Sequence, residues 1–289
     1  MPNTLSDENI KQVLEGISVP PQPQVLVDIH MEQAAKTIDI ERIAELIRQD
    51  IGLAGTVLKV VNSEYFGLKN KISSIQQAVE LLGGDCVINI VNGLAIKSEL
   101  SDEAIVAMSR FWDSATDVAL VAATLAKQVG FQNVDEAYAL GLFHCCGMPL
   151  LMTRFSNYNT VIEQAFSGTD ERIIDTENRH FNTNHAVVGY FVAKSWNLPA
   201  HLCELIAEQY NLSTIFDAEK RFTYESHKKN LLAILKMAQD ICDIHQVLGK
   251  QEKNHDWNKY GPAILEYIGL SLYDYDNLKE GFDDMGSIL

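Results

Sequence analysis

The chain has 289 residues, a formal net charge of −16 and 47% hydrophobic residues. This composition allows a sizeable core, and the length predicts one large or two small domains. An acidic surface repels nucleic acid and anionic lipid, so we expect neither a nucleic-acid partner nor a membrane. The N-terminus has no basic region followed by an apolar run, and the apolar stretch at 138–152 is too short to cross a bilayer. We therefore expect a soluble cytoplasmic protein.

Helical periodicity runs through nearly the whole chain. Asp39 is a predicted N-cap for a helix over 40–47, and the pattern continues after Asp50. Ser74 opens a further helix, which Gly83 closes. The later helices are predicted at about 102–129, 135–147, 157–166, 184–196, 199–210, 228–248 and 257–268.

The breaks between these helices are also predicted. Pro149 is expected to prevent continuation of the helix that stops at Gly147. Residues 212–227 mix polar and charged types and read as a surface excursion, and 273–289 as a docked short helix or a frayed tail. No segment alternates long enough to build a sheet, so the predicted fold is all-α.

The cysteines form an odd and scattered set, and in a cytoplasmic protein we expect them to be reduced: Cys86, Cys145, Cys146, Cys203 and Cys242. Cys145 and Cys146 are neighbours, whereas a metal-binding pair has two residues between its thiols. We interpret both as buried thiols of the core.

The stretch 138–152 is the most informative part of the sequence. His144 lies there at the end of a predicted buried helix, where a metal-dependent phosphohydrolase has His followed by Asp. Such a pair supplies an imidazole and a carboxylate to divalent metals, whose bound water becomes the nucleophile. Here Cys145 replaces the carboxylate, and a thiol cannot bridge two hard cations as a carboxylate does. The substitution favours a signalling module over an enzyme.

Several short phrases occur in a fixed order along residues 15–245. They are the proline-rich 20–23, the Asn-Ser-Glu-Tyr-Phe-Gly of 62–67, the helix of 74–83, Phe-Trp at 111–112, Gly-Leu-Phe-His at 141–144, 184–189 after Glu177, and Trp-Asn-Leu-Pro at 196–199. Together they resemble the HDOD family of bacterial signalling proteins, which are non-catalytic relatives of the HD phosphohydrolases. The resemblance implies a multi-helix HD-like bundle with a helical N-terminal lobe, and a role in signalling and regulation.

On this resemblance the chain divides into four parts. An N-terminal helix is expected over 1–18, and the N-terminal helical lobe over 19–100. A degenerate HD-like bundle follows over 101–248, and a C-terminal helical extension over 249–289.

The resemblance also locates a degenerate site. An HD enzyme has a His early in its central helix, where this chain has Ser114, and a doubled His near the positions of Gln209 and Tyr210. The surviving candidates are His144, Cys145, Glu177, His185 and Asp240. His144, His185 and Asp240 could in principle hold one zinc ion with an open position.

Each candidate also has a plainer interpretation. His144 is typical of a hydrogen-bonded core histidine, and the His185 ring could bond to a neighbouring turn or to Glu177. Asp240 lies on the core-facing side of its helix, where a buried carboxylate needs a partner such as His144 or His185.

We therefore expect no catalytic residue, no metal and no cofactor. The main hypothesis is a non-enzymatic regulatory module that acts through contacts with signalling proteins or as a homodimer. Two alternatives stay open. One is an altered metal-dependent phosphohydrolase that uses His144, His185 and Asp240, and the other is a sensor that binds a small molecule or nucleotide in the degenerate pocket.

Overall fold

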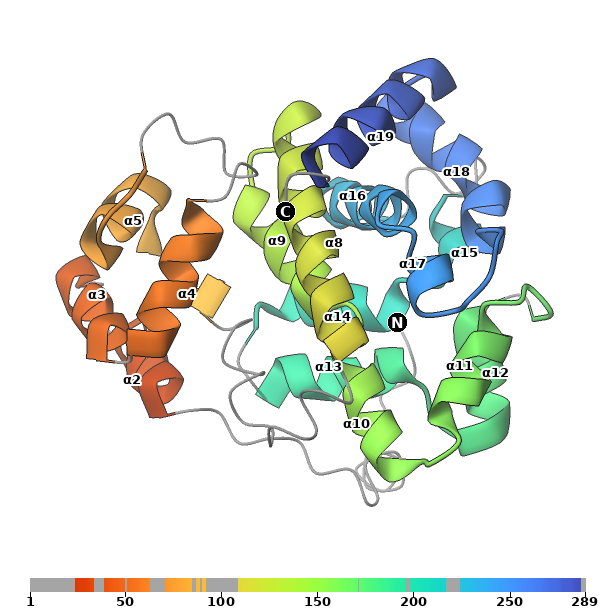
Figure 1. The fold of residues 1–289 in the computed structure, drawn as a ribbon, viewed down its shortest axis with the longest axis horizontal. Helices are drawn as coiled ribbons and strands as arrows, with labels where there is room; N and C mark the ends of the chain where they lie inside the picture. The colour runs from red at the N-terminus through yellow and green to blue at the C-terminus, as the bar shows by residue number, and fades with distance from the viewer. Residues whose placement is uncertain are drawn as a thin grey trace.

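Every regular element in the computed structural model is a helix, as the periodicity predicts (Figure 1). The predicted helix over 1–18, the proline connector, Cys86 and most of the 62–67 phrase lie outside the described residues. The structure describes residues 24–33, 39–49, 51–62, 71–84, 87–88, 90–91, 109–170, 172–195, 198–216 and 224–286.

Four short helices form the N-terminal lobe, drawn in red and orange in Figure 1: α2 (Gln24–Gln33), α3 (Ile40–Gln49), α4 (Ile51–Val61) and α5 (Ile75–Leu82). Asp39 caps α3 by accepting hydrogen bonds from the backbone N–H groups of Glu41 and Arg42, at 3.0 and 3.1 Å. Ser74 accepts from the Gln77 N–H at 3.2 Å, and Gly83 ends α5 with a positive φ of 85°. Both predicted caps are confirmed.

Asn62, directly after α4, is hydrogen-bonded to the backbone of Ile72, three residues before α5. Its side-chain amide donates to the Ile72 carbonyl at 2.7 Å and its side-chain oxygen accepts from the Ile72 N–H at 2.6 Å. The Asn62 side chain thus bonds to both backbone polar groups of Ile72, as a residue of a neighbouring β-strand would. The asparagine of the 62–67 phrase therefore has a structural role in the lobe.

The centre of the bundle consists of α8 (Ser109–Gln128), α9 (Val134–Phe143) and α16 (Ser226–Ile241), which pack against one another. Gly141 allows α8 and α9 to approach closely, because a Cβ at this position would lie 2.6 Å from the Ala119 Cα. The close approach fixes the end of α9, and with it His144, against the middle of α8.

The chain after His144 departs from the prediction of a single helix that stops at Gly147. Helix α9 ends at Phe143, the chain turns through residues 144–146, and α10 (Gly147–Arg154) begins at Gly147. Pro149 lies in the first turn of α10, where a missing N–H costs no helical hydrogen bond. The proline therefore starts a helix here rather than ending one.

The remaining helices of the bundle are α11 (Tyr158–Ala165), α12 (Ile173–Phe181), α13 (His185–Ser195) and α14 (Ala200–Glu208). Helix α12 was not predicted. Asn184 caps α13 by accepting from the Val187 N–H at 3.0 Å.

Residues 212–216 are not wholly at the surface: in the short helix α15 (Leu212–Ile215) and after it, Leu212, Ile215 and Phe216 are buried, while Ser213 and Thr214 are exposed. The helix predicted over 228–248 is interrupted at residues 242–243, after which α17 (Ile244–Val247) follows.

The C-terminal end folds back onto the bundle through α18 (His255–Ile268) and α19 (Leu272–Gly286). Tyr275 and Phe282 of α19 are buried, so this end is a docked helix. None of the helices in the described ranges is long and apolar enough to cross a membrane.

Candidate functional site

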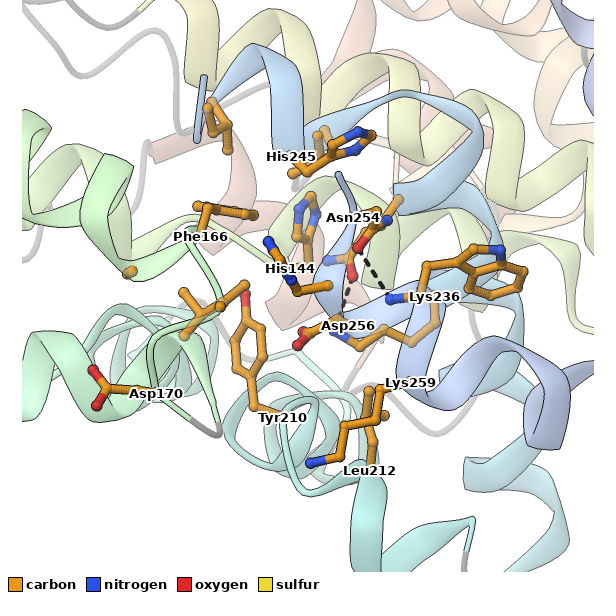
Figure 2. A pocket seen from close by; sticks show the side chains of 18 of the residues that line it. His144, Phe166, Asp170, Tyr210, Leu212, Lys236, His245, Asn254, Asp256 and Lys259 are labelled. Carbon is orange, nitrogen blue, oxygen red and sulfur yellow. Dashed lines mark hydrogen bonds between the residues drawn. The ribbon is translucent and has the colours of Figure 1, made fainter. Parts of the chain in front are cut away.

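A pocket of about 370 Å³ opens beside the end of α9 (Figure 2). The residues that form its wall are far apart in the sequence, from His144 to Ile264. Basic side chains on it are His144, Lys236, His245, His255 and Lys259, and Asp170 and Asp256 are its acidic groups.

His144 is buried at the end of α9 and faces this pocket. Its Nδ1 lies 2.5 Å from the Gly141 carbonyl oxygen and donates to it, which leaves Nε2 with the lone pair. Burial lowers the pKa of His144 to about 3, and the Lys236 charge lowers it further. The ring is therefore neutral at pH 7.

Cys145 does not provide a second ligand beside His144. Its Sγ lies 3.9 Å from the carbonyl oxygen of Phe111 in α8, and burial raises the pKa of the thiol to about 12. The thiolate is the form that binds metals, and this cysteine is a neutral thiol at pH 7.

His185 has hydrogen-bond partners on both ring nitrogens. Its Nδ1 lies 2.5 Å from Glu177 Oε2 and its Nε2 lies 2.9 Å from the Tyr210 hydroxyl. Tyr158 donates to the other Glu177 oxygen at 2.6 Å. All four side chains are buried, and they form one continuous hydrogen-bonded chain. The contact between His185 and Glu177 that the sequence suggested is therefore present.

Two positions where an HD enzyme has histidine carry side chains that bond to the backbone. The Ser114 hydroxyl donates to the Arg110 carbonyl at 2.6 Å. Gln209 donates to the carbonyl oxygen of His144 at 2.8 Å, so it fixes the backbone of the candidate histidine. Neither side chain replaces an imidazole as a ligand.

Asp240 takes different partners from those that the sequence suggested. Asn254 donates to its Oδ1 at 2.8 Å, the Tyr275 hydroxyl donates to Oδ2 at 2.7 Å, and the Lys279 ammonium lies 3.4 Å from Oδ2. Tyr275 and Lys279 belong to α19. The carboxylate thus anchors the C-terminal helix and is not among the residues that line the pocket.

Lys236 is the site residue that sequence reasoning missed. Its Nζ lies 4.3 Å from the centre of the Tyr210 ring and donates to Gln239 Oε1 at 2.9 Å. Burial lowers the pKa of Lys236 to about 8, although Asp256 raises it. A lysine one turn before Asp240, within the apolar face of α16, was the available signal, because a buried lysine needs a local reason.

These donors do not fit the divalent-metal centre of an HD enzyme. His144 offers one free nitrogen, while His185 and Asp240 already have partners and Cys145 is protonated. The Lys236 ammonium shares the pocket wall with His144 and repels a divalent cation. In the described part of the chain, the one group of three or more potential ligand atoms close enough to share an ion lies elsewhere.

Comparison with known proteins identifies the family. The pattern of the HDOD domain matches residues 19–212, two thirds of the chain. The chain belongs to the HDOD family. An uncharacterized protein of Treponema pallidum (strain Nichols) is 26% identical to it over 200 residues, and the match covers 67% of this chain and 38% of that protein. The chain thus spans well under half the length of this relative.

Solved structures share the fold. An HDOD domain protein of Geobacter sulfurreducens with unknown function has a TM-score of 0.64 and 21% identity, over 95% of this chain and 92% of its own. A protein of Shewanella amazonensis SB2B, named "Putative phosphohydrolase", has a TM-score of 0.63 and 22% identity over 95% and 94%. These similarities establish the HD-like helical fold of the HDOD family for this chain.

Proposed function

We propose that this HDOD protein is a non-enzymatic regulatory module of signal transduction that acts through protein–protein contacts. The observation that carries this proposal is the Lys236 ammonium in the pocket wall that also holds His144. A charged lysine there takes the electrostatic role that a metal ion has in a hydrolase. The same charge disfavours a divalent cation beside His144, and with it the metal-bound water that a metal-dependent hydrolase uses as its nucleophile.

The N-terminal lobe offers a surface for contacts with a partner. Its helices leave Met31, Ile40 and Leu81 exposed, and Met31 and Leu81 each keep 61% of their surface accessible. Large apolar side chains on a rigid helical lobe are typical of residues that another protein covers.

The interaction is tested by crosslinking the protein to its partners inside cells. A triple variant Met31→Glu, Ile40→Glu and Leu81→Glu is expected to lose specific crosslinked products, because charged groups disfavour burial at an interface. Val247→Glu, on the exposed side of α17, is the matched control and should retain them. Unchanged crosslinking in the folded triple variant contradicts the proposal.

The absence of catalysis is tested separately. Purified protein is incubated with Mg²⁺, Mn²⁺ or Zn²⁺ and a panel of nucleotides and cyclic dinucleotides, and no turnover is expected. Turnover that His144→Ala abolishes would instead favour the altered phosphohydrolase.

A second function has support from the chemistry of the pocket. Its volume falls at the lower end of small-ligand sites, and its wall carries the two lysines Lys236 and Lys259. Such a wall suits an anionic ligand such as a nucleotide. Binding would raise the thermal unfolding midpoint with one class of nucleotide, and the exposed-side variant Lys259→Ala would reduce that shift. No shift with any nucleotide contradicts the sensor hypothesis.

A further inference from the structure

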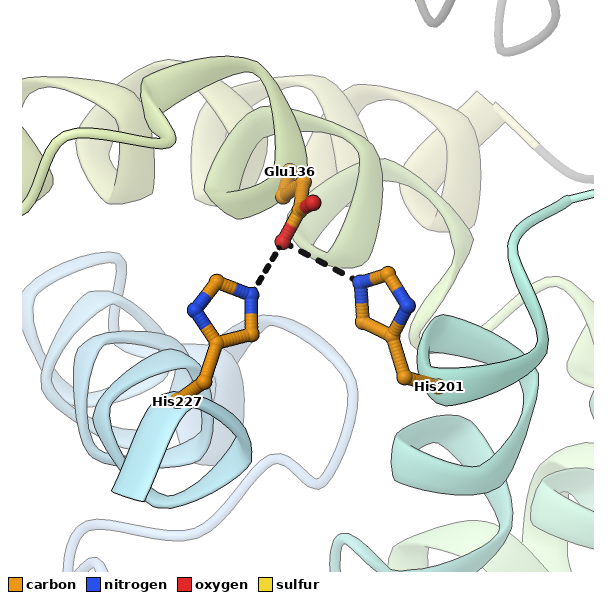
Figure 3. Close-up of side chains that lie close together, drawn as sticks. All are labelled: Glu136, His201 and His227. Atoms are coloured by element: carbon orange, nitrogen blue, oxygen red, sulfur yellow. Dashed lines mark hydrogen bonds and ion pairs between the residues drawn. The ribbon is translucent and has the colours of Figure 1, made fainter. Parts of the chain in front are cut away.

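Three potential metal ligands converge at the opposite ends of their helices from the pocket residues. Glu136 lies in the first turn of α9, His201 is the second residue of α14, and His227 is the second residue of α16. Figure 3 shows both imidazole rings directed at the same carboxylate oxygen. None of the three residues lines the pocket beside His144.

The distances between the three side chains suit a shared ion. His227 Nε2 lies 2.6 Å from Glu136 Oε2, and His201 Nε2 lies 3.1 Å from the same oxygen. One ligand atom from each residue can be chosen so that all three lie within 4.8 Å of one another. The three side chains come from helices that are distant in the sequence, so only the tertiary fold brings them together.

One imidazole nitrogen of this group forms no hydrogen bond with the described residues. His201 Nε2 is buried and, among the described residues, has no partner that meets hydrogen-bond geometry, although it lies at ion-pair distance from Glu136. A buried polar nitrogen without a partner calls for an explanation. A cation between the three side chains would accept the lone pairs of both Nε2 atoms and of Oε2 at once.

We propose that Glu136, His201 and His227 form a binding site for a divalent transition-metal ion, with zinc as the preferred ion. Two imidazole nitrogens, one carboxylate oxygen and a water in the fourth position make a common zinc ligand set. With metal–ligand bonds of about 2.0–2.1 Å, neighbouring ligand atoms of a tetrahedron stand about 3.3 Å apart. The His201 contact with Glu136 needs to lengthen by about 0.2 Å and the His227 contact by about 0.7 Å.

The side chains are free enough to make this adjustment. The relative exposure of the three side chains is 16% for Glu136, 29% for His201 and 35% for His227, so a water can complete the coordination. The ring of Phe131 packs 5.3 Å from that of His227 and limits its rotation. The result is a partly open and partly pre-oriented site.

Further charged side chains lie near the proposed ligands in the chain. Glu204 lies three residues after His201 in α14, and Glu225 lies two residues before His227. Lys228 forms an ion pair with Glu204 and lies 3.8 Å from Glu225. The positive ends of the helix dipoles of α9, α14 and α16 oppose the ion, and the Glu136 carboxylate offsets them. A bound ion would crosslink the starts of these three helices.

The test titrates Zn²⁺ and Co²⁺ into chelator-treated full-length protein. One equivalent of Zn²⁺ is expected to bind and to raise the thermal unfolding midpoint, and Co²⁺ is expected to give the visible bands of a tetrahedral site. His201→Ala, His227→Gln and Glu136→Gln should each weaken binding by more than about 100-fold. His180→Ala, an exposed histidine of α12, is the matched control and should bind as the parent protein does.

Three outcomes overturn the proposal. The first is no binding at a tenfold excess of metal, which means that the Glu136 carboxylate only forms polar contacts with the two imidazoles. The second is weak binding that no single variant changes, which indicates non-specific binding of the metal to histidines elsewhere on the surface. The third is binding that survives in His201→Ala and His227→Gln but is lost in His144→Ala. Only this third result also contradicts the proposed function, because it places the metal in the pocket.

Discussion

Glu177 of α12 and His185 of α13 form a pair with no side-chain exposure, in which the His185 Nδ1 lies 2.5 Å from Glu177 Oε2. Tyr158 and Tyr210 extend the pair at its two ends, and burial raises the pKa of both phenols. Each polar side-chain atom of these four residues therefore has a hydrogen-bond partner. The histidine that resembles a metal ligand thus connects α12, α13 and the end of α14.

Removal of the carboxylate is expected to destabilise the protein strongly. Glu177→Ala leaves both the His185 Nδ1 and the Tyr158 hydroxyl buried without an acceptor. We expect a loss of about 3–5 kcal/mol in the free energy of unfolding, measured by urea denaturation. The exposed Glu80→Ala in α5 should change it by less than about 0.5 kcal/mol. A loss below about 1 kcal/mol in Glu177→Ala contradicts this account of the pair.

Lys236 gives the protein a characteristic dependence on alkaline pH. The pKa of Lys236 is about 8 in the folded protein and near the ordinary lysine value of 10.5 in the unfolded chain, so the unfolded state binds more protons between these values. The contribution of Lys236 to stability therefore rises as the pH rises from about 8 to 10.5. The difference between the two pKa values corresponds to on the order of 3 kcal/mol in the free energy of unfolding.

The check compares the parent protein with Lys236→Met. Urea denaturation at pH 7 and at pH 10 should show that the stability of the variant relative to the parent is greatest at pH 7 and declines toward pH 10. The difference between the two proteins removes the effects of groups that titrate in both. A difference that stays constant with pH would mean that the lysine is not held in a desolvating site.

The described cysteines are expected to resist thiol reagents in the folded protein. Burial raises the pKa of Cys145 to about 12 and that of Cys203 to about 11, and it also raises the pKa of Cys146 and Cys242. At pH 8 these thiols are protonated and mostly shielded. Peptide mapping after brief iodoacetamide treatment should show little label at these positions in native protein and full label in urea. Rapid native labelling of Cys145 would contradict the packing at the end of α9.

Gly147 is expected to tolerate no side chain. A Cβ there would lie 2.2 Å from the carbonyl oxygen of His185 and 2.8 Å from the Gly189 nitrogen, and both are backbone atoms. Gly147→Ala must push α10 away from α13, at a cost of about 1–3 kcal/mol or more by thermal or urea denaturation.

The control for this change is Gly55→Ala. A Cβ at Gly55 meets nothing within 4 Å, and the residue is exposed within α4. Alanine has the better helix propensity, so this variant should gain up to about 1 kcal/mol. Equal effects of the two substitutions would show that the α10–α13 contact is looser than described.

The helical periodicity and the caps were readable from the sequence because they depend on residues close together in the chain. Asp39 and Ser74 each bond to a backbone group within three residues, and such contacts follow from spacing alone. The helix predicted to stop at Gly147 ends at Phe143, and Gly147 instead begins α10. Spacing could not show that the chain turns and starts α10.

The site shows the same division. The sequence alone determined the all-α fold, the ordered phrases of the HDOD family and the presence of Cys145 beside His144. Only the tertiary structure decided that Tyr210 is the second partner of His185 and that Tyr275 of α19 holds Asp240. It also decided that Lys236 shares a wall with His144 and that His201 and His227 face Glu136. These hydrogen bonds join residues that are 25 to 91 positions apart in the chain. The physical reason is that such contacts depend on how distant helices pack, which no local sequence pattern predicts.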